Sequence, residues 1–131
     1  KSFPVAHLAQ LVARLPGWAP MMMQRTELDI MPASGPQFPG YSIEKTATLL
    51  AEFDRNAAAG RAALAAASDD DFNVPWTLKK TGAVVMTAPR YQILRSMVLN
   101  HIVHHRAQLG LYLRMLEQRV PQMYGPTADE R

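Results

Sequence analysis

Hydrophobic residues recur at intervals of three and four positions through three long stretches of the chain, which is the spacing of amphipathic helices. The first stretch covers residues 5–26, with an interruption at Pro16-Gly17. The second covers residues 42–67, and the third opens at Pro89 and extends to about Gln118. The pattern therefore predicts a chain that is mostly helical.

The second stretch carries signals at both of its ends. Ser42 is a suitable N-cap, and Glu44 in the first turn would be favoured by the helix dipole. The run Ser68-Asp69-Asp70-Asp71 ends the pattern, and its lack of alternating ligands favours a solvated turn over a calcium loop. The face expected to be buried consists of Leu49, Leu50, Phe53, Ala57 and Leu64.

Two segments break the helical pattern. Residues 31–41 are rich in proline and glycine, which predicts a loop. Residues 74–87 place two short apolar runs on either side of Lys79-Lys80-Thr81-Gly82, which predicts two extended pieces joined by a turn.

These elements predict a single domain over residues 1–131, with an all-α fold and a short hairpin-like excursion before the last helix. Four helices would close the core of a helical bundle, and the pattern supplies three. We therefore expect the missing first helix to lie upstream of Lys1.

Composition and charge exclude several classes of function. Hydrophobic residues make up 48% of the chain and charged residues 19%, which fits a globular domain. The net charge of +3 is mild and its lysines and arginines are scattered, so we expect no nucleic-acid partner. No apolar run reaches the roughly 18 residues that span a bilayer, and no signal peptide opens the chain. Cysteine is absent, which removes disulfides and thiolate ligands and fits a cytoplasmic protein.

Three of the four histidines, His101, His104 and His105, lie within a span of five residues inside the last helical stretch. His101 and His105 are four apart, so they share a helix face, and they lie on its apolar stripe. Such a pair can chelate one divalent ion, for example Zn, Ni, Mn or Fe, with open positions left for water or substrate. His104 and Gln108 could support that site from outside, by orienting a ligand or a bound water. The alternative is that these histidines are hydrogen-bonded packing residues.

Several motifs in this sequence resemble the DinB-like superfamily, and together they cover nearly the whole chain. The strongest are Leu99–Leu109, around the histidines, then Tyr112-Leu113-Arg114, and the ending Val120–Glu130. The others are Leu15-Pro16-Gly17-Trp18, Glu27-Leu28-Asp29 and Pro75-Trp76-Thr77-Leu78.

The resemblance implies a four-helix bundle, whose first helix would be missing here, and a site of three histidines around a divalent metal. Two of the three match His101 and His105. The third would lie seven residues before Trp18, where this chain has Leu11. His7, one turn earlier on the same face, is a weaker candidate for the third ligand.

The resemblance also implies an enzyme. Metal-bearing relatives include thiol S-transferases that use bacillithiol, mycothiol or glutathione, and a mycothiol-dependent maleylpyruvate isomerase. The expected partners are a low-molecular-weight thiol and a small electrophilic substrate, and a metal-assisted hydrolase is a second enzymatic option. Because Leu11 cannot coordinate a metal, the alternative is a non-catalytic, stress-related or ligand-binding protein. Relatives often dimerise, so a homodimer is expected.

Overall fold

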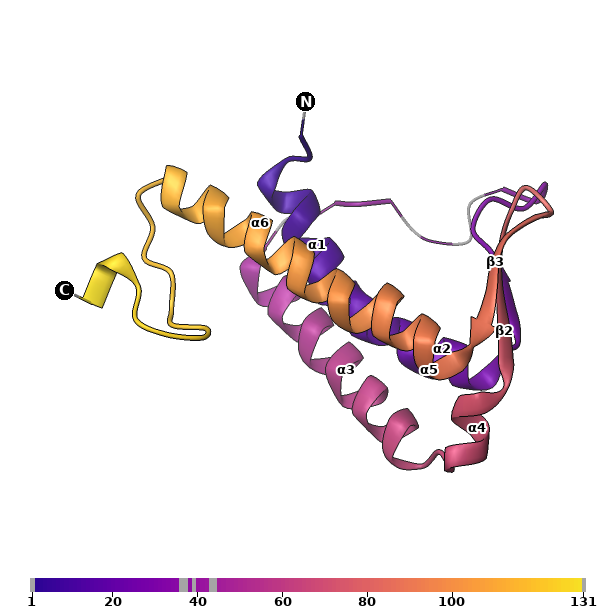
Figure 1. Cartoon of the computed structure of the whole chain (residues 1–131). Coiled ribbons are helices and arrows are strands. Elements are labelled where there is room, and N and C mark those ends of the chain that lie inside the picture. Colours follow the sequence, from indigo (N-terminus) through magenta and orange to yellow (C-terminus); the bar gives the residue numbers. More distant parts are fainter. Residues whose placement is uncertain (1, 36–37, 39, 43–44, 131) are drawn as a thin grey trace.

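The computed structural model describes residues 2–35, 38, 40–42 and 45–130. Three helical rods run together, and a small sheet covers one end of them (Figure 1). The first rod contacts both of the others. The rods are α1 (Val5–Arg14), the 3-10 turn η1 (Leu15–Gly17) and α2 (Trp18–Gln24); α3 (Thr46–Ala65); and α5 (Arg90–Leu94), the π-helix η2 (Arg95–Asn100) and α6 (His101–Met115).

The helical prediction is confirmed in its main features and wrong in some of its boundaries. The chain passes Pro16 in a 3-10 turn, so α1 and α2 follow each other without a loop. α3 begins at Thr46, with Lys45 as its N-cap in place of Ser42, and the expected place of Glu44 lies outside the described residues. α6 ends at Met115, because Glu117 adopts a left-handed conformation with φ of 56° that stops the helix.

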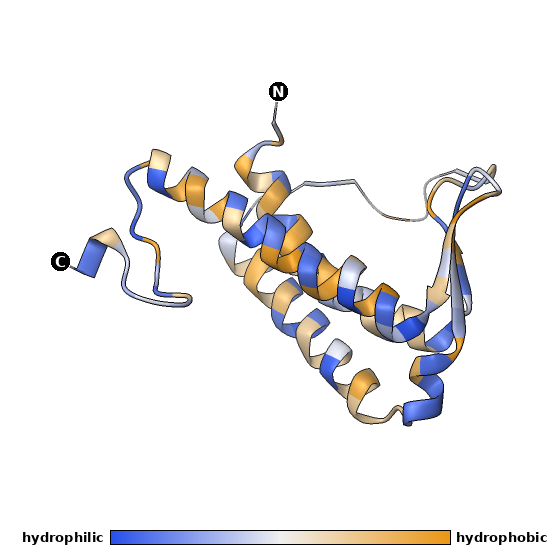
Figure 2. Ribbon diagram, viewed as in Figure 1, coloured by the Kyte–Doolittle hydropathy of each residue, from blue (hydrophilic) through white to orange (hydrophobic). Residues whose placement is uncertain are grey.

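The acidic run after α3 starts a short helix, α4 (Asp69–Asn73), which is mostly hydrophilic (Figure 2), although its Phe72 packs against the core. Ser68 caps this helix, because its Oγ accepts a hydrogen bond from the backbone N–H of Asp71 at 3.3 Å. The Asp71 carboxylate in turn accepts from the backbone N–H of Ser68 at 2.9 Å. Asp71 thus completes a capping box with Ser68, in which each side chain bonds the backbone N–H of the other residue.

The predicted hairpin is confirmed as β2 (Pro75–Lys80) and β3 (Ala83–Pro89), which pair antiparallel. Thr81 and Gly82 form its turn with positive φ angles of 53° and 78°. A third strand, β1 (Glu27–Asp29), pairs parallel to β2, so that the sheet order is β1-β2-β3.

The expected all-α four-helix bundle is therefore wrong, because the fold is mixed and includes a three-stranded sheet. β1 forms for three reasons that act together. Leu28 is only 3% exposed and enters the core. Lys79 of β2 makes an ion pair with Glu27 at 2.7 Å. The carboxylate of Asp29 accepts hydrogen bonds from the backbone N–H groups of Thr81 and Gly82 at 3.0 and 2.6 Å, which ties β1 to the hairpin turn.

The main core lies where α2, the sheet and the start of the last rod meet. Met22, Trp76 and Ile93 are fully buried in it, and their neighbours in the cluster are Ala19, Leu28, Leu78, Leu94 and Val98. Met21 and Met23 pack against the cluster, so the three consecutive methionines fill the core. Within the described part of the chain, no helix has the length and apolar character needed to cross a membrane.

Candidate functional site

The two histidines of the predicted pair lie in the first turns of α6, directly after the π-helix η2. In a regular α-helix the backbone N–H of His101 would donate to the carbonyl of Met97, four residues earlier. Here that N–H donates to the carbonyl of Val98. The carbonyl oxygen of Met97, which this N–H does not use, lies 3.3 Å from Nδ1 of the His101 ring. The irregular turn thus supplies a backbone acceptor that orients His101.

The side chains of His101 and His105 converge. Their Nε2 atoms lie 2.8 Å apart, with the ring centroids 4.6 Å apart and the ring planes tilted by 46°. His105 is only 7% exposed, and His101 is partly buried. The structure therefore brings together the two residues that the four-residue spacing placed on one face.

Each ring of the pair has its own hydrogen-bond partner at Nδ1. Nδ1 of His105 lies 2.8 Å from the side-chain amide of Gln108, and Nδ1 of His101 faces the Met97 carbonyl. The 2.8 Å between the two Nε2 atoms is a hydrogen-bond distance, so the neutral pair can share one proton there. A divalent ion in place of that proton would be bound by two imidazoles, each held by an outer partner.

Burial lowers the pKa of His101 below its usual 6.5, and the neighbouring His105 lowers it further. The hydrogen bond to Met97 acts in the opposite direction but does not outweigh these effects. The neutral ring, which is the form that ligates metals, is thus favoured at His101.

The other predicted site residues take different places. His7 is stacked between the rings of Phe3 and Tyr41, at centroid distances of 4.2 and 3.7 Å. His104 is exposed and touches His105 only edge-on, with centroids 4.9 Å apart. Across the residues that the structure describes, no group of three or more His, Cys, Asp or Glu side chains is arranged to hold a metal ion.

A pocket of about 300 Å³ opens beside His101, between α1, α2 and α3. Leu11 lines it together with His101. The position aligned with the third family histidine therefore faces the same pocket as one histidine of the pair. The remaining lining residues are Arg14, Leu15, Gly17, Trp18, Phe38, Tyr41, Glu52 and Asn56. An apolar side chain therefore stands where the resemblance implies a ligand.

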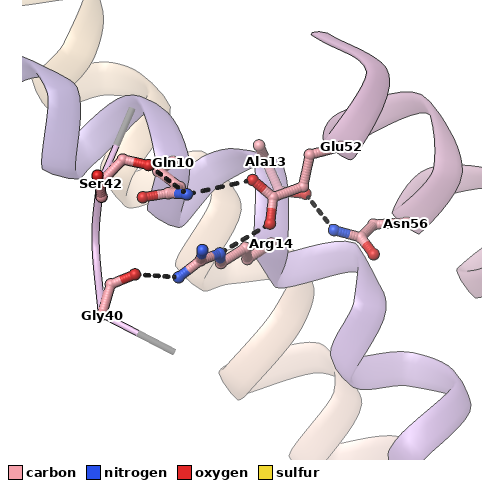
Figure 3. Close-up of polar contacts among 7 residues, drawn as sticks. All are labelled: Gln10, Ala13, Arg14, Gly40, Ser42, Glu52 and Asn56. Carbon is pink, nitrogen blue, oxygen red and sulfur yellow. Dashed lines mark hydrogen bonds and ion pairs between the residues drawn. The ribbon is translucent and has the colours of Figure 1, made fainter. Parts of the chain in front are cut away.

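Glu52 of α3 organises the polar side of this pocket (Figure 3). Its carboxylate accepts from Nε of Arg14 at 2.8 Å and from Nε2 of Gln10 at 3.3 Å, both on α1. Arg14 and Gln10 also donate to the backbone carbonyls of Gly40 and Ser42 in the loop before α3. Burial alone would raise the pKa of Glu52, but the bonds from Arg14 and Gln10 lower it below its usual value. The carboxylate is thus held ionised, and it ties α1 and the loop to α3.

The sequence pattern did not reveal these pocket residues. Arg14 and Glu52 are separated by 38 positions, and no local spacing signals a pair so distant. The Met97 carbonyl could not be found either, because it depends on a π-helical turn that has no marked sequence signal.

No protein-family model, curated protein or solved structure matches this chain significantly. Any assignment of function therefore depends on the residues of the site.

Proposed function

We propose that the protein is a DinB-like, metal-dependent enzyme that acts on small molecules, with His101 and His105 as the metal ligands. The observation that carries this proposal is the 2.8 Å approach of the two Nε2 atoms, each on a ring whose Nδ1 has a hydrogen-bond partner of its own. Imidazole nitrogens suit Zn, Ni, Mn or Fe, so the donor set fits a divalent ion. The proposal rests on this pair and on the motifs around it, since the mixed fold does not support it.

A bound ion would supply Lewis acidity, either to hold a low-molecular-weight thiol as its thiolate or to activate water. The first option is a thiol S-transferase that acts on small electrophiles, and the second is a hydrolase. The chain has no cysteine, so a thiol has to come from solution. Gln108 would hold His105 in the ligating tautomer, and Leu11 would keep one side of the site apolar.

A second candidate function is favoured by Leu11. Because this residue lines the pocket with His101, an apolar side chain stands where the resemblance implies a third imidazole. A stress-related DinB-like protein that has lost full metal binding and retains a small ligand would have this arrangement. The two candidates differ in whether the histidine pair takes up metal.

We also propose that the protein works as a cytoplasmic homodimer without nucleic-acid partners. Large hydrophobic side chains remain exposed on α3 and α6, for example Leu50 at 57%, Leu111 at 63% and Met115 at 69%. Exposed apolar groups of this kind are frequent at subunit interfaces. Light scattering coupled to gel filtration measures the mass directly, and a monomer of 14.6 kDa at all concentrations would contradict the dimer.

Titration calorimetry with ZnCl₂ and NiCl₂ tests the metal site. We expect one ion per histidine pair, and His101→Ala and His105→Ala should each abolish binding. His104→Ala is the matched control, because this exposed neighbour lies outside the pair. Leu11→His should tighten binding by adding a third imidazole at the pocket.

Each outcome separates the two candidates. Uptake that depends on both His101 and His105 supports the enzyme. Occupancy far below one ion per chain in the unaltered protein, together with saturable uptake by Leu11→His, supports the non-catalytic alternative. His7→Ala should leave the affinity unchanged, since His7 is stacked between Phe3 and Tyr41.

A further inference from the structure

The walls of the pocket beside His101 are unusually aromatic for a chain in which aromatic residues make up 8%. Trp18, Phe38 and Tyr41 line it, and the aliphatic side chains of Leu11 and Leu15 complete the apolar surface. Its volume of about 300 Å³ lies at the small end of the range of ligand pockets, which is about 300–1,000 Å³. The space suits one small molecule with a flat apolar body.

The aromatic walls are held in place by their neighbours. The rings of Trp18 and Phe38 stack with centroids 5.6 Å apart and planes 10° apart. Tyr41 stacks on His7 at 3.7 Å, and the guanidinium of Arg14 lies 5.3 Å from the Tyr41 ring centroid. Such a surface binds a ligand with little further ordering, which favours affinity.

The pocket has little net charge. Its charged lining residues are Arg14 and Glu52, and these form an ion pair with a distance of 2.8 Å. Asn56 adds an amide whose Nδ2 donates to the backbone carbonyl of Ala13 at 3.0 Å. A charged ligand would have to compete with the existing ion pair, whereas an uncharged ligand would leave it intact.

We propose that this pocket binds an uncharged, planar aromatic molecule, whose ring packs against Trp18, Phe38 and Tyr41 and whose polar substituent lies toward Glu52 and Asn56. This proposal specifies the substrate class of the proposed function. It rests on that function because it treats His101 as part of the site. The binding step itself needs no metal and can be measured alone.

The test compares benzamide with cyclohexanecarboxamide, which carries the same uncharged substituent on a saturated, non-planar ring. The chain has two tryptophans, so its ¹H–¹⁵N spectrum contains two indole signals. Trp18 lines the pocket, and Trp76 is fully buried in the core. We expect benzamide to shift the Trp18 signal in a saturable manner, with little change at Trp76 and a much weaker effect of cyclohexanecarboxamide.

Substitutions of the aromatic residues that line the pocket then test whether benzamide binds there. Tyr41→Ala and Phe38→Ala should each weaken benzamide binding about three- to tenfold, since an aromatic contact contributes about 0.5–1.5 kcal/mol. Their matched controls are Tyr91→Ala and Phe53→Ala, residues of similar exposure that do not line the pocket. These controls should bind benzamide as the unaltered protein does.

A Trp18 signal that does not move up to the solubility limit of benzamide would overturn the proposal. Equal binding of the saturated amide would overturn it as well, because the planar ring would then not matter. If a wall variant also shifts Trp76, its fold has changed, and the comparison of the two amides on the unaltered protein decides. The spectra are recorded without added metal, so a failure here is distinct from a failure of metal uptake in calorimetry.

Discussion

Gly60 of α3 packs directly against the carbonyl oxygen of Pro16, at the turn between α1 and α2. A Cβ atom at residue 60 would lie 2.7 Å from that oxygen, which is closer than non-bonded atoms approach. The obstacle is main chain, so an added methyl group can be accommodated only by moving one rod away from the other. We expect Gly60→Ala to lower the free energy of unfolding by about 1–3 kcal/mol, the usual range for overpacking. Urea unfolding measures this as a lower midpoint.

Gly110 of α6 is the matched control for that substitution. A Cβ at residue 110 would meet only Val120 and Met123 side chains, at an ordinary contact distance of 3.8 Å. Gly110→Ala should therefore raise the free energy of unfolding by up to about 1 kcal/mol, because alanine favours the helix. The close approach of α3 to Pro16 would be contradicted if Gly60→Ala and Gly110→Ala had equal effects.

The helices and the hairpin were predictable because their signals are local. Hydrophobic periodicity marked each rod, and the run Lys79–Gly82 marked the turn of the hairpin. β1 was not predicted, because a three-residue strand forms only through contacts distant in sequence, such as the 52-residue separation between Asp29 and Thr81. The parallel pairing of β1 with β2 therefore has no local cause.

Burial was harder to predict than helix formation. Leu50 and Phe53 fall on the apolar face of α3, yet they are 57% and 39% exposed. α3 and the last rod both pack on the first rod, and a cavity of about 540 Å³ lies between them. The helical pattern shows which face is apolar, but it cannot show whether that face has a neighbour.

The histidine pair of the candidate site was predictable because its signal is also local. The approach of His101 to His105 follows from their four-residue spacing, and Gln108 follows from its position one turn later. The pocket residues come from different elements, and only the tertiary fold brings Glu52 beside Arg14.

The tautomer of His105 is a direct test of the geometry of the pair. If Oε1 of Gln108 faces the ring, as it does here at 2.8 Å, Nδ1 carries the proton and Nε2 is free to bind a metal ion. We expect long-range ¹H–¹⁵N spectra of the imidazoles near neutral pH to identify His105 as the Nδ1–H form. A signal from the Nε2–H form would mean that Gln108 presents its amide NH₂ group to the ring, and the two rings would then share an ordinary hydrogen bond.

Gln108 should influence metal affinity without touching the ion. Gln108→Ala removes the acceptor that fixes His105, and loss of such an outer partner typically weakens binding about 10- to 100-fold. Gln108→Glu keeps an acceptor at the same distance and should retain the affinity. Calorimetry with ZnCl₂ measures both variants, and Gln92→Ala, at an exposed position of α5, is the control. Equal affinity in Gln108→Ala and the unaltered protein would show that His105 needs no such partner.

Asp29 accepts hydrogen bonds from three backbone N–H groups, two of which lie in the hairpin turn. Besides Thr81 and Gly82, its carboxylate accepts from the backbone N–H of Met31 at 2.9 Å. Partial burial raises the pKa of Asp29, but the hydrogen bonds from Met31, Gly82 and Thr81 outweigh it, and the pKa lies below the usual 3.8. The folded state thus favours the ionised carboxylate.

The lowered pKa of Asp29 predicts how stability responds to acid. Its contribution is complete above the unfolded-state pKa of 3.8 and is lost as the pH falls from there through the folded-state pKa, because the unfolded chain binds the proton more readily. The Asp29→Asn side chain does not titrate. Its NH₂ group would face backbone N–H donors and could not accept from them, so this variant should be less stable near neutral pH. The difference from the unaltered protein should shrink in urea unfolding at about pH 3. Asp54→Asn, the same substitution at an exposed position on α3, is the matched control. If the difference in free energy of unfolding between Asp29→Asn and the unaltered protein stayed constant with pH, the carboxylate charge would not be what holds β1 to the hairpin.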